Sequence, residues 1–148
     1  MLRFYLTARG RISRKATWLA VMLPIIPLMF AAAAADVSLF PEIEFTFLGT
    51  VYTPFIAALT VLVAWPSFAT SIRRFHDLNM TGWWAALMLA LYWTPDFAGF
   101  FQMSNTEKAA IVAWVVCASI GGLLALAQLF VRGTIGQNRF GPDPTERD

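Results

Sequence analysis

The chain has 148 residues, of which 58% are hydrophobic and 14% charged, and its formal net charge is +2. Soluble domains carry about 25% charged residues, and disordered chains combine high charge with low hydrophobicity. The composition therefore excludes a disordered chain and disfavours an ordinary soluble domain. One cysteine and one histidine exclude an internal disulfide and leave no soft-ligand metal cluster, so no metal or other cofactor is expected.

Four apolar stretches are long enough to cross a bilayer as helices, because about 20 apolar residues span its core. A soluble four-helix bundle would keep a polar face on each helix. We therefore expect an all-α fold, an integral membrane four-helix bundle that forms one membrane domain over residues 1–148. The predicted spans are about 16–35, 48–72, 82–103 and 108–131, and a cytoplasmic tail follows at 132–148.

The first stretch has a second interpretation. Basic residues, an apolar run and the alanines at 31–35 also resemble a secretory signal peptide with its cleavage site. The run is longer than the roughly 7–15 residues of a signal peptide's apolar core, and Pro24 and Pro27 interrupt it. An uncleaved first span is therefore preferred.

Lysine and arginine are distributed unevenly over the connections. Ten of the eleven basic residues fall before the first span, between the second and third spans, or in the tail, and Lys108 is the exception. Because cytoplasmic connections are enriched in Lys and Arg, we expect both termini to be cytoplasmic.

Small residues recur every four positions in the fourth span, at Ala113, Cys117, Gly121 and Ala125. Small side chains at this spacing allow helices to approach closely in lipid. We expect this helix-packing stripe to lie inside the molecule, in preference to a dimer interface. Cys117 is then an inert packing residue and not a redox centre.

Two polar clusters lie at predicted cytoplasmic helix ends, one after the second span and one in the tail. The planar fork of donors on arginine suits a phosphate, but an ion pair that only holds a helix end needs the same residue types. His76 has no partner nucleophile at a recognisable spacing, so no catalytic residue is predicted. The candidate cytoplasmic polar cluster, which we expect to meet in space, comprises Arg11, Arg14, Arg73, Arg74, His76, Asp77, Asn138, Arg139 and Asp143.

Three sequence blocks resemble the signature of a known family. They are Gly10-Arg11-Ile12-Ser13-Arg14-Lys15 followed by Trp18, then Arg73-Arg74-Phe75-His76-Asp77 with Gly82-Trp83-Trp84, and Gly136-Gln137-Asn138-Arg139-Phe140-Gly141-Pro142-Asp143-Pro144. In this order, and over nearly the whole chain, they resemble the bacterial family called domain of unknown function 805. The resemblance implies a small multi-pass protein of the bacterial inner (cytoplasmic) membrane. It brings no established activity, substrate or catalytic residue.

The sequence favours a non-enzymatic membrane module that binds anionic lipid head groups or a partner protein at its cytoplasmic face. A small-solute transporter or channel is one alternative, which a polar cavity reaching mid-membrane would favour. A membrane enzyme acting on a phosphorylated lipid is another, which a deep pocket exposing His76 beside an arginine would favour. Membrane lipids are the expected partners, a second copy or another membrane protein is a further candidate, and no nucleic acid is expected.

Overall fold

The computed structural model describes residues 2–47, 50–100 and 107–147, and this part of the chain is mostly helical, with one short hairpin and irregular connections. In chain order the elements are α1 (Leu2–Leu6), α2 (Arg14–Thr17), the π-helical turn η1 (Trp18–Met22), α3 (Leu23–Leu39), β1 (Phe45–Phe47), β2 (Thr50–Tyr52), α4 (Pro54–Asp77), α5 (Trp83–Phe100), α6 (Glu107–Phe130) and the 3-10 turn η2 (Pro144–Arg147).

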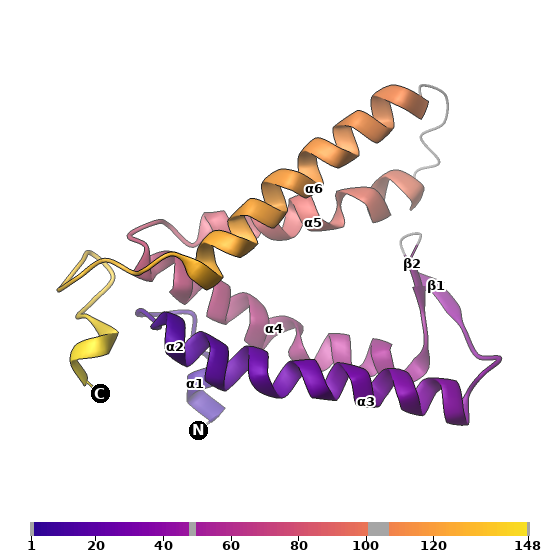
Figure 1. Cartoon of the computed structure of the whole chain (residues 1–148), viewed down its shortest axis with the longest axis horizontal. Coiled ribbons are helices and arrows are strands. Elements are labelled where there is room, and N and C mark those ends of the chain that lie inside the picture. The colour runs from indigo at the N-terminus through magenta and orange to yellow at the C-terminus, as the bar shows by residue number, and fades with distance from the viewer. Residues whose placement is uncertain (1, 48–49, 101–106, 148) are drawn as a thin grey trace.

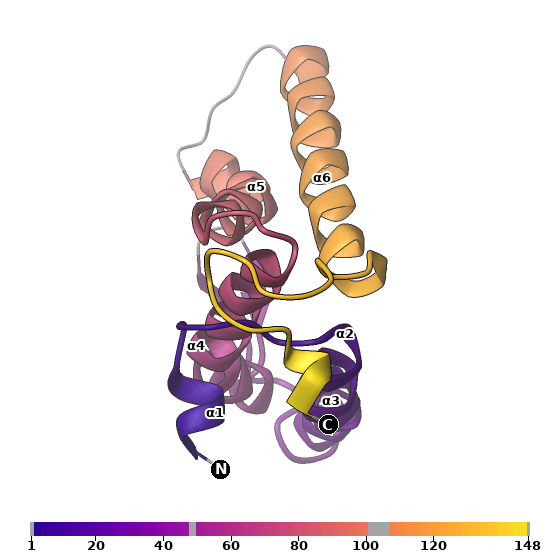
Figure 2. The ribbon, with the colours of Figure 1, turned by 90° about the vertical axis from the view of Figure 1, so that its left-hand side faces the viewer.

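The long helices form two pairs. Helix α3 packs along α4, and α5 packs along α6. The pairs meet at one end of the molecule and diverge toward the hairpin (Figure 1). Figure 2 looks onto the meeting end and shows the tail crossing from the end of α6 to α2. We call this the polar end; it consists of residues 4–18, the last turns of α4 and α6, and residues 131–146.

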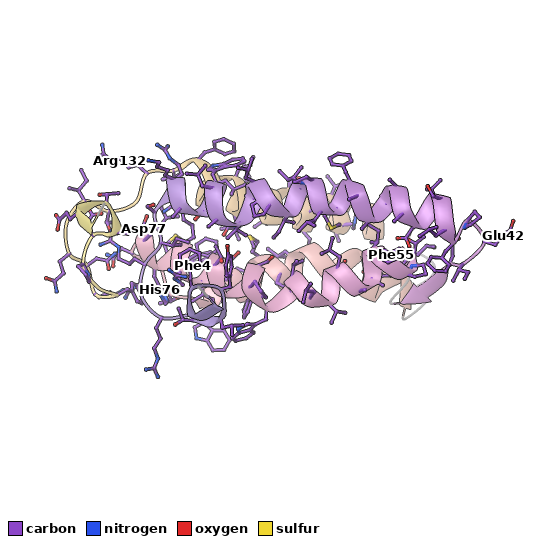
Figure 3. All side chains as sticks on the ribbon, turned by 90° about the horizontal axis from the view of Figure 1, so that it is seen from below. Phe4, Glu42, Phe55, His76, Asp77 and Arg132 are labelled. Atoms are coloured by element: carbon purple, nitrogen blue, oxygen red, sulfur yellow. The ribbon has the colours of Figure 1, made fainter. Side chains whose placement is uncertain are left out.

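The opposite end of the α3–α4 pair, called the far end, contains the hairpin and the adjoining turns of the two helices. Figure 3 shows this separation along the molecule: His76, Asp77 and Arg132 lie at the polar end, whereas Glu42 and Phe55 lie at the far end. Polar side chains of the described residues are buried mainly at these two ends, so any site built from them belongs to one end or the other.

Three continuous helical segments are long and apolar enough to cross a membrane, namely Arg14–Leu39, Pro54–Asp77 and Val112–Phe130. Their surfaces carry large exposed apolar side chains, such as Phe30, Val61 and Leu123. Water would penalise such a surface and lipid would not. A mostly helical protein with three candidate membrane-spanning helices is therefore confirmed for the described residues.

The third predicted span corresponds to α5, which is 18 residues long. The number of crossings and the side on which the termini lie stay predictions. Residues 101–103 of the third predicted span and residues 48–49 of the second lie outside the described residues.

The start of the second predicted span was wrong. Instead of a helix from residue 48, the chain forms an antiparallel hairpin in which Phe45 pairs with Tyr52 and Thr46 with Val51. Aromatic and β-branched residues favour strands, and Pro54 opens α4 at a position where proline is well tolerated. Absence of charge is compatible with burial in lipid, but it carries no information about conformation.

The first span begins at a well-formed cap and contains one irregular turn. The hydroxyl of Ser13 accepts a hydrogen bond from the backbone N–H of Ala16 at 3.1 Å, which satisfies one of the free donors of a helix start. The π-helical turn η1 then leads into α3, with Pro24 in its first turn and Pro27 inside it. A proline lacks the N–H that an α-helix needs, and a wider turn beside it relieves the strain on the backbone.

The predicted small-residue stripe on α6 is covered over part of its length. Gly121 is buried, Cys117 and Ala125 are half-buried, and Ala113 is exposed. Each step of four residues advances about 40° around a helix, so the stripe turns by about 120° over its length. Ala113 therefore leaves the face on which Gly121 packs, and its place in a packing stripe stays a prediction.

Candidate functional site at the polar end

Asp77, the last residue of α4, is the centre of the polar end. The Nη2 atom of Arg11 lies 2.9 Å from its Oδ1, and Nε of the same arginine donates to Oδ1 at 3.0 Å. Arg74 donates from Nη1 to Oδ2. All three side chains are buried. Hydrogen bonds between ions are strong when water is excluded, so Asp77 fixes the segment before α2 to the end of α4.

The end of α6 is capped by side chains from other segments. Arg74 donates from Nε to the carbonyl of Gln128 at 2.6 Å and from Nη2 to that of Val131. The carbonyl of Leu129 accepts a hydrogen bond from the Trp18 indole at 3.1 Å, and that of Phe130 accepts one from the Arg14 guanidinium at 2.9 Å. The last carbonyls of a helix lack partners within the helix and carry partial negative charge. Cationic side chains therefore stabilise this end and join the two helix pairs.

The tail is held against Asp77 by backbone contacts as well as by ions. Arg11 donates to the carbonyls of Thr134 at 2.5 Å and Gly136 at 2.6 Å. The N–H and hydroxyl of Thr134 both donate to the carbonyl of Asp77, at 2.8 and 3.0 Å. Gly133 passes so close that a Cβ there would lie 1.9 Å from the Asp77 Oδ2. Only glycine permits this approach without a shift of the carboxylate.

Asp143 closes the tail on itself. Its Oδ2 accepts from the N–H of Gly136 at 2.8 Å, and its Oδ1 accepts from the hydroxyl and N–H of Thr145 at 2.7 and 2.9 Å. These hydrogen bonds favour the ionised carboxylate, with the Thr145 hydroxyl as the largest cause, and lower the pKa of Asp143 to about 2. The carboxylate is therefore charged at neutral pH and holds the tail in a compact loop.

His76 is part of the packing between the tail and α4. Its Nδ1 lies 3.0 Å from the carbonyl of Gly10, and its ring stacks on Phe140 with 3.9 Å between centroids. The Arg139 guanidinium lies over the same Phe140 ring. Asn138 donates to the carbonyl of His76 at 2.9 Å. These contacts orient the imidazole against protein groups.

Arg73 stands apart from this network. Its Nη1 donates to the carbonyl of Phe4 at 2.7 Å, and its guanidinium lies 4.7 Å above the Phe4 ring. Phe4 belongs to α1, and the end of this helix is also held by Trp65, whose indole donates to the carbonyl of Leu6 at 3.0 Å. Helices α1 and α6 are thus both capped by one tryptophan and one or more arginines.

The structure brings eight of the nine predicted cluster residues together around one network and leaves Arg73 on α1. The eight are Arg11, Arg14, Arg74, His76, Asp77, Asn138, Arg139 and Asp143. Sequence reasoning missed Trp18, Gly133 and Thr134 as members. The first had a usable signal, because Trp18 follows Arg14 by four residues and so shares its helix face.

A small recess opens beside the network. It has a volume of about 160 Å³, and its walls include the basic residues Arg14, Lys15 and Arg132. All three of these residues are exposed. Asp77 and Asp143 also contribute to its lining, but their oxygens are engaged by the contacts described above. The recess therefore presents positive charge that the described carboxylates do not neutralise.

Comparison with known proteins identifies relatives over almost the full length. The family described as "Protein of unknown function (DUF805)" matches residues 5–142. The chain is similar to the inner membrane protein YhaH of Escherichia coli strain K12, with 29% identity over 97% of this chain and 92% of the relative. It is also similar to the inner membrane protein YhaI of the same strain, with 26% identity over 97% of this chain and 91% of the relative. No solved structure is a significant match.

Proposed function

The chain belongs to the DUF805 family, a family of proteins of unknown function, and from that premise we propose that it is an inner-membrane module whose polar end faces the cytoplasm and binds anionic lipid head groups. The names of its Escherichia coli relatives support the membrane assignment. The binding role rests on the structure of the polar end.

The orientation is supported by the position of the basic residues. Ten of eleven lie in segments at or next to the polar end, and Lys108 lies at the start of α6, away from it. Cytoplasmic loops favour Lys and Arg. In a Cys117→Ala background, a cysteine at the exposed Thr145 should resist membrane-impermeant thiol reagents in intact cells. A cysteine at Glu42, exposed at the far end, should react, and the reverse pattern would refute the orientation.

The binding role rests on one observation: some basic residues of the polar end are buried and paired, whereas others are exposed and form no ion pair. Arg11 and Arg74 are buried and fully engaged in holding the polar end together. Among the described residues, Arg14, Lys15 and Arg132 are exposed around the small recess and form no ion pair. Each basic residue near an anionic leaflet contributes about 1 kcal/mol of attraction. The buried arginines thus make a rigid base, and the exposed ones supply the contact surface.

The other two hypotheses draw less support from the described residues. Transport favours ionisable groups within the membrane, but the buried charges lie at the two ends of the α3–α4 pair. Catalysis by His76 would need a reachable nucleophile or substrate, and the imidazole is instead stacked and hydrogen-bonded to protein.

Retention of lipid by the purified protein tests the binding role. The full chain would be extracted with native lipids, and bound phosphatidylglycerol would be counted by native mass spectrometry. Lys15→Gln with Arg132→Gln should lower retention by roughly tenfold or more, and raised salt should weaken binding to the wild type. Lys108→Gln, a charge removed away from the polar end, should change nothing. Equal retention by the double variant and the wild type would refute the proposal.

A further inference from the structure

A second and larger recess lies on the other side of the segment that precedes α2. It has a volume of about 460 Å³, and its walls are formed by α1, residues 9–13, the end of α4 and the tail. Two buried arginines line it, Arg11 and Arg73. We call it the Arg73 recess, because Arg11 is paired with Asp77 and Arg73 forms no ion pair with the described residues. Phe4, Arg9, Ala16 and Phe140 contribute to the same lining.

Arg73 has unused donors. The residue is 8% exposed, and its Nε is buried without an acceptor in the described part of the chain. Its contact with Phe4 uses Nη1 and the face of the guanidinium. An arginine has five N–H donors, and the hydrogen bond to Phe4 uses only the Nη1 nitrogen. A buried donor without a partner is costly, so this side chain is poised for an acceptor that the described chain does not supply.

The charges at the polar end lead to the same conclusion. Three arginines are buried there, Arg11, Arg73 and Arg74, against the two buried carboxylates of Asp77 and Asp143. Asp77 is shared by Arg11 and Arg74, and Asp143 is engaged by the tail. No carboxylate of the described residues forms an ion pair with Arg73. Because buried charges are normally paired, one anion is missing from this end.

The chemistry of the walls indicates the class of anion. A guanidinium offers parallel N–H donors that match the oxygens of phosphate. Phe4 covers one face of the guanidinium, so its edge remains for hydrogen bonding. Arg9 is exposed at the wall of the recess and can approach the same ligand as a second cation. Phe140 also lines the recess and gives it an apolar wall.

We propose that the Arg73 recess binds one phosphate group, with Arg73 as the main donor and Arg9 as the second. The group comes either from an anionic phospholipid head group or from free phosphate. This inference goes beyond the proposed function, since it names a discrete site where the other describes a charged surface. The two use different residues, so the Lys15 and Arg132 experiment can fail while this site stands, and the converse also holds.

Two probes and three variants test the site on the full-length protein in detergent. Inorganic phosphate is titrated against chloride of equal ionic strength, and thermal unfolding is followed. Phosphatidylglycerol is added separately, and bound lipid is counted by native mass spectrometry. Arg73→Gln removes the charge. Ala16→Leu keeps every charge and fills the recess. Lys108→Gln removes a basic residue at the start of α6, which does not line the recess.

We expect the wild type to be stabilised by a ligand that binds the folded state. Arg73→Gln and Ala16→Leu should each lower the apparent affinity by about tenfold or more, and Lys108→Gln should not. This pattern with inorganic phosphate assigns the site to free phosphate, and the same pattern only with phosphatidylglycerol assigns it to a lipid head group. If Arg73→Gln does not fold, Ala16→Leu decides. The site is overturned if neither probe binds the wild type, or if binding does not depend on Arg73 or on the space beside Ala16.

Discussion

The two ends of the α3–α4 pair each bury an aspartate, but they neutralise it in different ways. Asp77 at the polar end pairs with Arg11 and Arg74. Asp36 at the far end accepts from the N–H groups of Phe55 and Ile56 at 2.8 and 2.9 Å, and from the Thr53 hydroxyl. Asp36 forms no ion pair among the described residues.

The helix to which each carboxylate is bound explains this difference. Asp36 lies against the first turn of α4, where free N–H groups and the positive end of the helix dipole favour an anion. Asp77 lies at the last turn of the same helix, where the dipole disfavours an anion. The far end therefore needs no cation, and the polar end needs arginines brought from elsewhere in the sequence.

The consequence for architecture follows directly. The Asp36 cluster joins only the end of α3 to the start of α4, two consecutive long helices. The Asp77 cluster joins the segment before α2, the end of α4, the end of α6 and the tail. Ion pairing at the polar end thus holds the two helix pairs together, which the far end does not do.

The largest effect is expected at Asp77. Asp77→Asn keeps the shape of the side chain but leaves Arg11 and Arg74 buried without a counter-charge. Breaking a buried ion pair from one side costs about 3–5 kcal/mol. Thermal unfolding of the purified protein in detergent, followed by circular dichroism, measures the loss. Glu42→Gln removes an exposed acid at the far end and should stay within about 0.5 kcal/mol of the wild type. If Asp77→Asn unfolds at the same temperature as the wild type, the ion pairs of Asp77 do not hold the polar end together.

A second test uses two glycines. Gly133→Ala places a Cβ against the Asp77 Oδ2, and the carboxylate must move away from Arg74. Overpacking of this kind costs about 1–3 kcal/mol. Gly122→Ala, in α6, meets no atom within 4 Å and should gain about 0.5–1 kcal/mol because alanine favours a helix. The two variants should therefore shift the unfolding temperature in opposite directions, and a shared direction would contradict the close approach at Asp77.

Much of the membrane architecture follows from the sequence, because lipid imposes length and lack of charge on each span. The meeting of the 73–77 block with the tail also follows, since both were placed at helix ends on one side and buried charges need partners. The partner of each arginine does not follow. Arg74 and Arg73 are adjacent in sequence, yet one reaches Asp77 and the other reaches Phe4, because neighbouring residues on a helix point about 100° apart.

The role of Asp36 could not be predicted for a related reason. It follows an alanine run in the first span and carries no motif of its own. Its partners are backbone N–H groups of α4, which any residue supplies, so no sequence pattern marks them. The hairpin between α3 and α4 was missed, and with it the return of the chain that places the start of α4 beside Asp36.

The smallest effect, and the sharpest test of the comparison, is expected at Asp36. Asp36→Asn retains one carbonyl oxygen as an acceptor but replaces the other with an amide donor that faces the N–H groups of α4. Loss of such a helix-start contact should lower the unfolding temperature by roughly 2–4 °C, clearly less than Asp77→Asn, because no buried cation is left unpaired. Glu44→Gln, an exposed acid on the same connection, is the matched control and should not change it. If Asp36→Asn destabilises the protein as much as Asp77→Asn, the proposed difference between the two ends is wrong. The N–H groups at the start of α4 would then not stabilise a buried carboxylate in a different way from two arginines.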